Sequence, residues 1–110
     1  MTTKRKILSV LVAARKLITP REKWTQRVNA RDKFGRYTYP LNADAVCFCA
    51  QGAIARIAGG MGNPAKISAM VVLGSVIKGD VTTFNDAPKR THRQILAAFD
   101  RAIAKLKSTP

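Results

Sequence analysis

Acidic residues are scarce in this sequence. Only 6 Asp and Glu stand against 20 Lys and Arg, which gives a formal net charge of +14 at pH 7. A net charge of about 2 to 8 is enough to keep a small domain soluble, so solubility does not explain this excess. Because like charges repel one another in a folded monomer, we expect a polyanionic partner.

Cysteine, histidine and long apolar runs are scarce as well. The 2 cysteines and 1 histidine show no spacing typical of a zinc site, so we expect no metal and no cofactor. No stretch reaches the ~20 apolar residues that a membrane helix needs, and no basic leader with a cleavage site opens the chain. We therefore expect a cytoplasmic protein in a reducing setting, with no membrane partner.

Apolar residues are plentiful enough for one core. They make up 46% of the 110 residues, which predicts a single compact domain over residues 1–110. The most apolar stretch runs over 42–59, where few residues such as Gln51 and Gly52 interrupt it. With Asn42 as an N-cap and Gly59 as a left-handed stop, this stretch predicts a buried central helix.

Other elements follow from periodicity and turn residues. Apolar side chains at helical spacing predict amphipathic helices over about 3–18, from Pro64 to about 77, and from Thr91 onward. The turn Asp32-Lys33-Phe34-Gly35 predicts a small β-hairpin over about 26–39. The expected fold class is therefore mainly α, with about four helices arranged around the central helix 42–59.

Four short blocks occur in a characteristic order. They are Trp24-Thr25-Gln26, then Ala30-Arg31-Asp32 with Gly35, then residues 45–53 (AVCFCAQGA), and then residues 84–88 (FNDAP). With the closing helix, they resemble a small uncharacterised bacterial and phage family of unknown function. The resemblance covers nearly the whole chain and implies a compact autonomous domain, but it brings no activity or catalytic residue. Arg27 departs from the family's pattern, in which glycine or a small residue follows Gln26.

Phage relatives also imply a place of action. By analogy, the protein would act on host machinery or sequester a host signalling nucleotide, in the host cytoplasm if it is phage-encoded. An interaction protein that captures an acidic surface of a host or phage protein is a further alternative. The sequence leaves the oligomeric state open.

Catalysis finds little support in the sequence. On a helix, Cys47 and Cys49 would point about 200° apart and could not share a metal, so we expect both to be buried apolar side chains. Cys49, His92 and Asp86 could be drawn as a nucleophile, a base and an orienting group, but nothing in the sequence brings them together. We therefore predict binding rather than turnover, with no catalytic residue; Asp86, Asp32 and His92 are the ionisable groups to test first.

A second group of residues could line a ligand pocket for a nucleotide or cyclic nucleotide. Trp24 offers either a stacking surface or a lid on the core. Asn85 and Asp86 either contact a ligand or form their own backbone turn ahead of Pro88. The candidate pocket residues are Trp24, Gln26, Arg31, Asp32, Asn85 and Asp86.

Cations crowd the expected helix starts. The helix dipole is positive there, so each cation costs about 0.3 to 1 kcal/mol, whereas a phosphate group is favoured. If the first and last helices pack side by side, their charges form one face. The main hypothesis is binding of DNA, RNA or another polyanion through backbone phosphates. The expected contacts are Lys4, Arg5, Lys6, Arg15, Lys16, Lys89, Arg90, Arg93 and Arg101.

Overall fold

Helices make up most of the chain. The computed structural model describes residues 2–110. In order, its elements are α1 (Lys4–Leu17), the 3-10 helix η1 (Arg21–Lys23), β1 (Ala30–Arg31), β2 (Tyr37–Thr38), β3 (Cys47–Phe48), α2 (Ala50–Ala58), α3 (Pro64–Ile77), α4 (Val81–Asp86) and α5 (His92–Ser108). The expected mainly α class with a small β-hairpin is confirmed.

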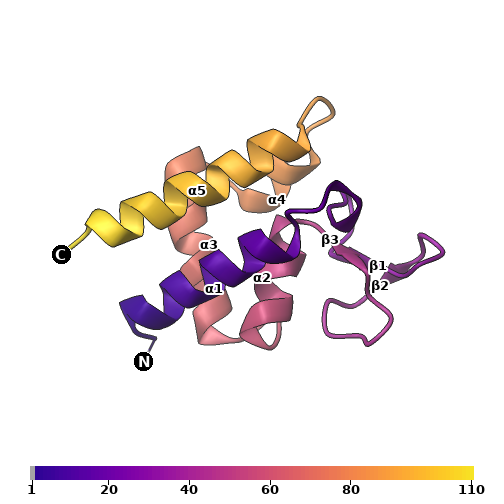
Figure 1. Cartoon of the computed structure of the whole chain (residues 1–110), viewed down its shortest axis with the longest axis horizontal. Helices are drawn as coiled ribbons and strands as arrows, with labels where there is room; N and C mark the ends of the chain where they lie inside the picture. The colour runs from indigo at the N-terminus through magenta and orange to yellow at the C-terminus, as the bar shows by residue number, and fades with distance from the viewer. Residues whose placement is uncertain (1) are drawn as a thin grey trace.

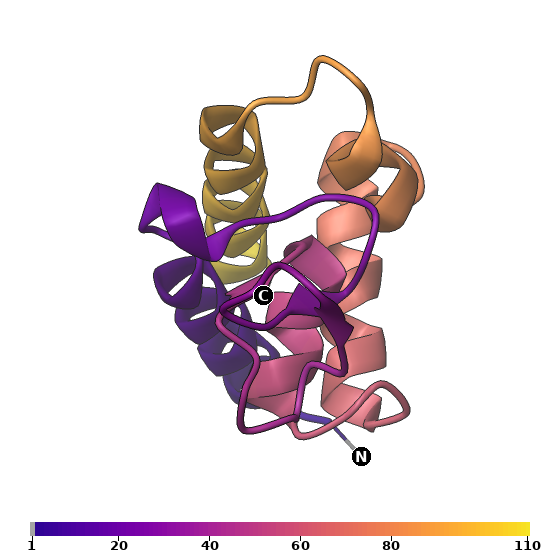
Figure 2. The ribbon, with the colours of Figure 1, turned by 90° about the vertical axis from the view of Figure 1, so that its right-hand side faces the viewer.

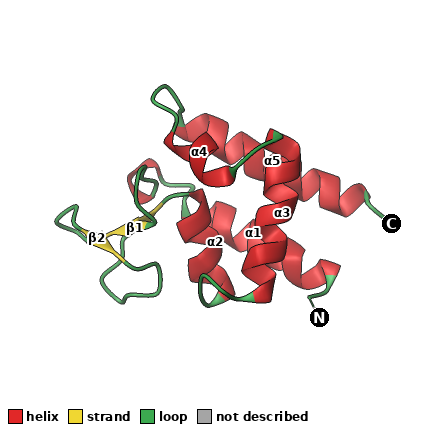
Figure 3. Ribbon diagram, turned by 180° about the vertical axis from the view of Figure 1, so that it is seen from behind, coloured by secondary structure: helices red, strands yellow, loops and turns green. Residues whose placement is uncertain are grey.

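The helices form two layers. α1 and α5 lie side by side in front, and α2, α3 and α4 lie behind them (Figures 1 and 3). α1 and α5 run antiparallel, since Lys4 Nζ at the start of α1 donates to the carbonyl of Thr109 just after α5. At the opposite end, a ring nitrogen of His92 lies 2.7 Å from the Ile18 carbonyl oxygen. Both chain ends therefore lie at the same end of the molecule.

The expected helix ends are largely confirmed. The hydroxyl of Thr3 accepts from the Lys6 amide and begins α1. Asn63 caps α3, which has Pro64 in its first turn. Thr91 and Gln94 form a complete capping box at the start of α5, because each side chain accepts from the backbone N–H of the other. The first, third and last helices are thus placed by short-range chemistry that the sequence shows directly.

The central helix is shorter than expected. It begins at Ala50, not at Asn42, so the start of the predicted helix 42–59 was wrong. Asn42 instead accepts from the Asp44 amide at 2.8 Å in a tight local turn. Residues 46–49 find backbone partners in the hairpin, since the Val46 amide donates to the Arg31 carbonyl at 2.9 Å. An extended segment that is paired in this way cannot also make helical hydrogen bonds.

The helical part that remains is the buried centre. Ala53 and Ile54 of α2 are fully buried, as are Leu11 of α1 and Phe99 of α5. Gly59 ends α2 with φ at 95°, as its sequence position predicted. α2 packs against α1 on one side and against α3 and α4 on the other, whereas α5 packs on α1 and α3.

The hairpin is confirmed, with shorter strands than expected and one additional strand. Antiparallel pairing joins β1 to both β2 and β3, in the sheet order β2-β1-β3. The amide of Gly35, whose φ is 79°, donates to the Asp32 carbonyl at 2.9 Å and closes the predicted turn. The sheet stands at the end of the helical layers where α1 ends (Figure 2).

The segment between α3 and α5 forms the short helix α4. The Asp80 carboxylate accepts from the Thr83 amide at 2.8 Å and from the Thr83 hydroxyl at 3.0 Å. These hydrogen bonds hold the pKa of Asp80 below the ordinary aspartate value, because they favour the charged form. α4 places Asn85 and Asp86 against the hairpin.

Candidate functional site

Asn85 joins α4 to the hairpin and to α2. Its side chain is fully buried. The amide oxygen accepts from the indole N–H of Trp24 at 2.8 Å and from the Ala50 amide at 3.0 Å. The amide nitrogen donates to the Thr25 carbonyl at 3.1 Å. The hydrogen-bonding capacity of Asn85 is therefore used inside the protein.

The neighbouring candidate pocket residues belong to the same network. The side-chain amide of Gln26 donates to the backbone carbonyl of Asn85 at 2.9 Å. One oxygen of Asp86, Oδ1, accepts from the Arg27 amide at 2.8 Å and from the Asn85 side chain at 2.9 Å. The Arg31 guanidinium donates to the backbone carbonyl of Gln26 at 3.1 Å. The structure thus brings five of the six candidates together, namely Trp24, Gln26, Arg31, Asn85 and Asp86.

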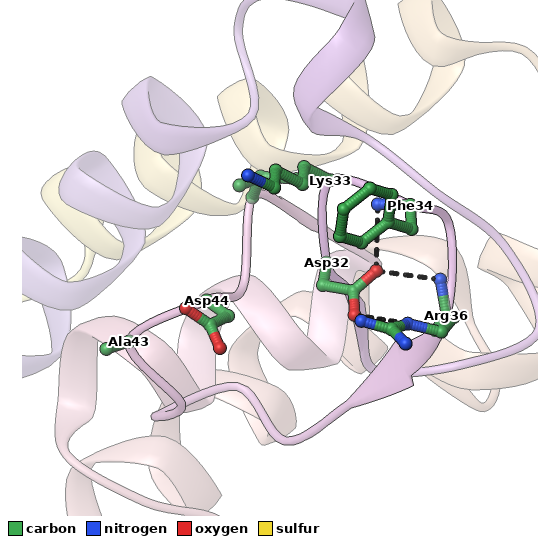
Figure 4. Close-up of a pocket in the computed structure, with 7 residues that line it drawn as sticks. Asp32, Lys33, Phe34, Arg36, Ala43 and Asp44 are labelled. Atoms are coloured by element: carbon green, nitrogen blue, oxygen red, sulfur yellow. Dashed lines mark hydrogen bonds and ion pairs between the residues drawn. The ribbon is translucent and has the colours of Figure 1, made fainter.

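Asp32 lies apart from this network. It faces a separate cavity of about 410 Å³ at the hairpin tip, where Asp44 lies on the neighbouring loop (Figure 4). Its carboxylate pairs with Arg36 Nε at 3.0 Å and accepts from the Phe34 and Arg36 amides. Partial burial raises the pKa of Asp32, but these hydrogen bonds outweigh it and hold the pKa below the ordinary value. The carboxylate therefore stabilises the turn.

Arg27 has an unusual backbone conformation. Its φ is 76°, in the left-handed region that glycine adopts most easily. An arginine side chain carries a steric cost in this region that glycine does not. Here the hydrogen bond from the Arg27 amide to Asp86 holds the arginine in a conformation that costs about 1 to 3 kcal/mol.

A second cavity, of about 270 Å³, opens beside the Asn85 network. It lies between the hairpin and the starts of α2 and α4. Sequence reasoning singled out only Asp86 among its polar residues as a ligand contact. The other polar side chains lacked a recognisable motif, and their convergence depends on how the hairpin packs. These side chains are Arg27, Asn29, Tyr37, Gln51 and Thr82.

Cys49 also lines this cavity, but in a structural role. The inference that both cysteines lie on a helix was wrong, because Cys47 belongs to β3 and Cys49 is the N-cap of α2. The Cys49 sulfur accepts from the Gly52 amide at 3.2 Å. Burial, and then the nearby Asp86 carboxylate, raise the pKa of the Cys49 thiol. The cysteine thus remains a neutral, buried capping group.

The structure does not bring Cys49, His92 and Asp86 together as a nucleophile, a base and an orienting group. Cys49 and Asp86 share the second cavity, whereas the His92 ring packs near the Trp24 ring with centroids 5.8 Å apart and contacts the Ile18 carbonyl. Within residues 2–110, no group of three or more His, Cys, Asp and Glu side chains could hold a metal ion.

The expected phosphate contacts divide into two groups. Four of them have intramolecular partners: Arg15 pairs with Asp100 at 3.0 Å, Arg90 lies over the Phe84 ring, Arg101 donates to the Val76 carbonyl and Lys4 donates to the Thr109 carbonyl. The others are exposed, and their side chains make no hydrogen bond or ion pair with any residue in 2–110. These are Arg5, Lys6, Lys16, Lys89 and Arg93.

Comparison with known proteins places the chain without naming an activity. No curated protein and no solved structure shows significant similarity to it. No helix within residues 2–110 combines the length and the apolar character that crossing a membrane requires. Residues 2–105 match a family of unknown function, DUF6197, and the chain therefore belongs to that family.

Proposed function

We propose that this protein binds a phosphate-rich polyanion, above all nucleic acid, through the outer face of the α1–α5 layer. The observation that carries the proposal is the charge of these two helices. Together they hold nine Lys and Arg side chains, and Asp100 is their one acidic residue. Arg15 neutralises that aspartate.

The antiparallel arrangement spreads this charge along the layer. Arg5 and Lys6 lie in the first turn of α1, at the end where α5 finishes with Lys107. Lys105 of the same turn donates to Ser75 of α3 at 3.0 Å and is directed away from this face. The 14 residues of α1 span about 21 Å at ~1.5 Å per residue. At ~3.4 Å of rise per base pair, this length corresponds to about six base pairs of a duplex, whose two strands both present phosphates.

The opposite end of the face carries Lys16 and Arg93. Neither has an intramolecular partner among residues 2–110, and both are exposed. Arg93 lies in the first turn of α5, where the helix dipole already disfavours a cation by about 0.3 to 1 kcal/mol. A bound phosphate offsets that cost, because its negative charge interacts favourably with both the side chain and the helix start.

The face supplies charge rather than sequence recognition. Between Arg5 and Lys16, the exposed side of α1 presents Ser9 and Val12. Such a surface contacts the phosphate backbone and leaves base edges unread, so we propose binding that is independent of duplex sequence. A cytoplasmic location, in the host cell if the protein is phage-encoded, is part of this proposal.

Matched single charge reversals test the assignment. We expect Lys16→Glu to weaken binding of a fluorescent DNA duplex clearly more than Lys33→Glu, which makes the same charge change at the hairpin tip. Equal losses in the two variants, or no binding of duplex DNA or RNA by the wild type, would remove the proposal. Polyglutamate of equal charge serves as a competitor. If polyglutamate competes with the labelled duplex as strongly as unlabelled DNA does, the partner is an acidic protein surface instead.

A further inference from the structure

The second cavity, of about 270 Å³, is lined by the aromatic ring of Tyr37 as well as by charged and polar side chains. We propose that it takes one unpaired base of a single-stranded nucleic acid, with the Tyr37 ring as the stacking surface. This inference rests on the proposed function, which supplies nucleic acid as the class of ligand. It adds a contact to a base, which the α1–α5 face does not provide.

Exposed aromatic side chains are concentrated on the hairpin. Of the seven aromatic residues, three are strongly exposed, and all three lie within residues 34–39. Phe34 is 69% exposed, Tyr37 53% and Tyr39 68%. The Tyr39 ring packs edge-on against Tyr37 with centroids 5.6 Å apart. Tyr37 also lines the cavity, so an exposed aromatic ring is available there for stacking.

Polar groups line the cavity beside that ring. The side-chain amide of Gln51 donates to Asn29 Oδ1 at 3.1 Å, and Lys66 donates to Gln51 Oε1 at 3.2 Å. Both amides are therefore held in fixed orientations. Asp86 uses Oδ1 internally, whereas its Oδ2 makes no hydrogen bond within residues 2–110. That oxygen is an acceptor for the exocyclic amino group of a base such as cytosine.

Arg27 supplies a cation at the same place. Its side chain is exposed and lines the cavity, and its left-handed backbone is held by Asp86. Strained backbone of this kind concentrates at ligand sites, where the surrounding structure over-determines the conformation. In this arrangement the guanidinium contacts the phosphate next to the stacked base.

The lining chemistry favours a base over a lipid surface. Exposed aromatic and basic side chains also occur in segments that bind membranes. Lipid headgroups, however, offer hydrogen-bonding groups but no π-face that could stack on the Tyr37 ring. A nucleobase has both a π-face for Tyr37 and polar edges for the amides of Asn29 and Gln51 and the carboxylate of Asp86.

The test compares strands with the same phosphates and different bases. We expect the wild type to bind oligo-dC more tightly than oligo-dT, and both more tightly than an abasic strand of equal length, as measured by fluorescence anisotropy. Tyr37→Leu, which keeps an apolar side chain of similar bulk, should lose roughly 5- to 100-fold in oligo-dC affinity and nothing in abasic affinity. Tyr37→Phe should retain binding, because it keeps the ring.

Phe34→Ala is the control, because Phe34 is an aromatic residue of the hairpin that is more exposed than Tyr37 and lines a different cavity. It should leave oligo-dC affinity unchanged. Far-UV circular dichroism and thermal unfolding confirm that each variant is folded. Equal binding of abasic and oligo-dC strands, or equal loss in Tyr37→Leu and Phe34→Ala, would overturn the inference alone. Failure of every strand to bind would overturn the proposed function as well. Tighter binding to anionic vesicles than to oligo-dC would assign the hairpin to membranes.

Discussion

Replacing Gly52 with alanine tests how the central helix is seated on the hairpin. A Cβ atom at this position would lie 1.8 Å from the carbonyl oxygen of Asn29 and 2.8 Å from its carbonyl carbon. Contacts under 3.0 Å essentially never occur for real Cβ atoms, so the two backbones must separate by more than 1 Å. The obstacle is backbone, and no side-chain rotation relieves it.

Separation also breaks bonds that fix the start of α2. The Cys49 amide donates to the same Asn29 oxygen at 3.3 Å, and the Ala50 amide donates to buried Asn85 at 3.0 Å. Overpacking typically costs about 1 to 3 kcal/mol, and a buried hydrogen-bonding group left without a partner costs about 1 to 3 kcal/mol more. We therefore expect Gly52→Ala to lower the free energy of unfolding by about 3 to 5 kcal/mol. For a domain of this size, that corresponds to a fall in Tm of roughly 10 to 25 °C.

Chemical denaturation followed by circular dichroism measures this loss. Gly62→Ala is the control, because a Cβ there has no atom within 4 Å. We expect the control to be unchanged or more stable by about 0.4 to 1 kcal/mol, since alanine restricts the unfolded chain. A Gly52→Ala variant within about 0.5 kcal/mol of the wild type would refute the close packing of α2 on the hairpin.

Three further predictions concern single side chains. Trp24→Phe removes one donor to the buried Asn85 oxygen, so we expect a loss of about 1 to 3 kcal/mol in a urea titration; an unchanged midpoint would contradict the role of Asn85 as a hub. Iodoacetamide should modify half-buried Cys47 well before Cys49, which is 3% exposed and has a raised pKa, and equal rates would contradict that placement. Because the folded pKa of Asp80 is lowered, its stabilising effect is present above the ordinary pKa of 3.8 and is lost as pH falls through the lowered value. The Tm difference between wild type and Asp80→Ala should therefore shrink from pH 7 to pH 3, and a constant difference would contradict the capping role.

Helix ends could be predicted wherever the signal was local. Thr91 and Gln94 form a reciprocal pair of hydrogen bonds across three residues, and Asn63 with Pro64 likewise acts within one turn. Gly59 ends the central helix through its own backbone conformation. None of these depends on distant parts of the chain, so the sequence alone was sufficient.

The start of the central helix depended on distant residues instead. A short apolar run such as residues 45–50 fits a strand or a helix equally well by periodicity. β1, which lies at Ala30–Arg31, decides between them by offering backbone partners to β3. Cys49 then caps α2 through its sulfur, although cysteine is not among the residues preferred at this position.

The candidate site was predictable only in part. The sequence singled out the blocks around Trp24, Gln26 and Asn85, and the structure brings them together. Their internal hydrogen bonds could not be predicted, because they join residues about 60 positions apart. Tyr37 carries no motif, and its exposure follows from the register of β2 against β1.

The most direct test of the polyanion account is the salt dependence of duplex binding. About six phosphate contacts along the α1–α5 face predict a fall in affinity of about 10³ between about 50 and 200 mM salt. The double variant Lys16→Glu with Arg93→Glu should reduce the slope of log K against log salt concentration by about two units, because each lost phosphate contact removes about one unit. An affinity that stays constant over this range, or a slope unchanged in the double variant, would contradict the assignment of these helices to phosphate binding.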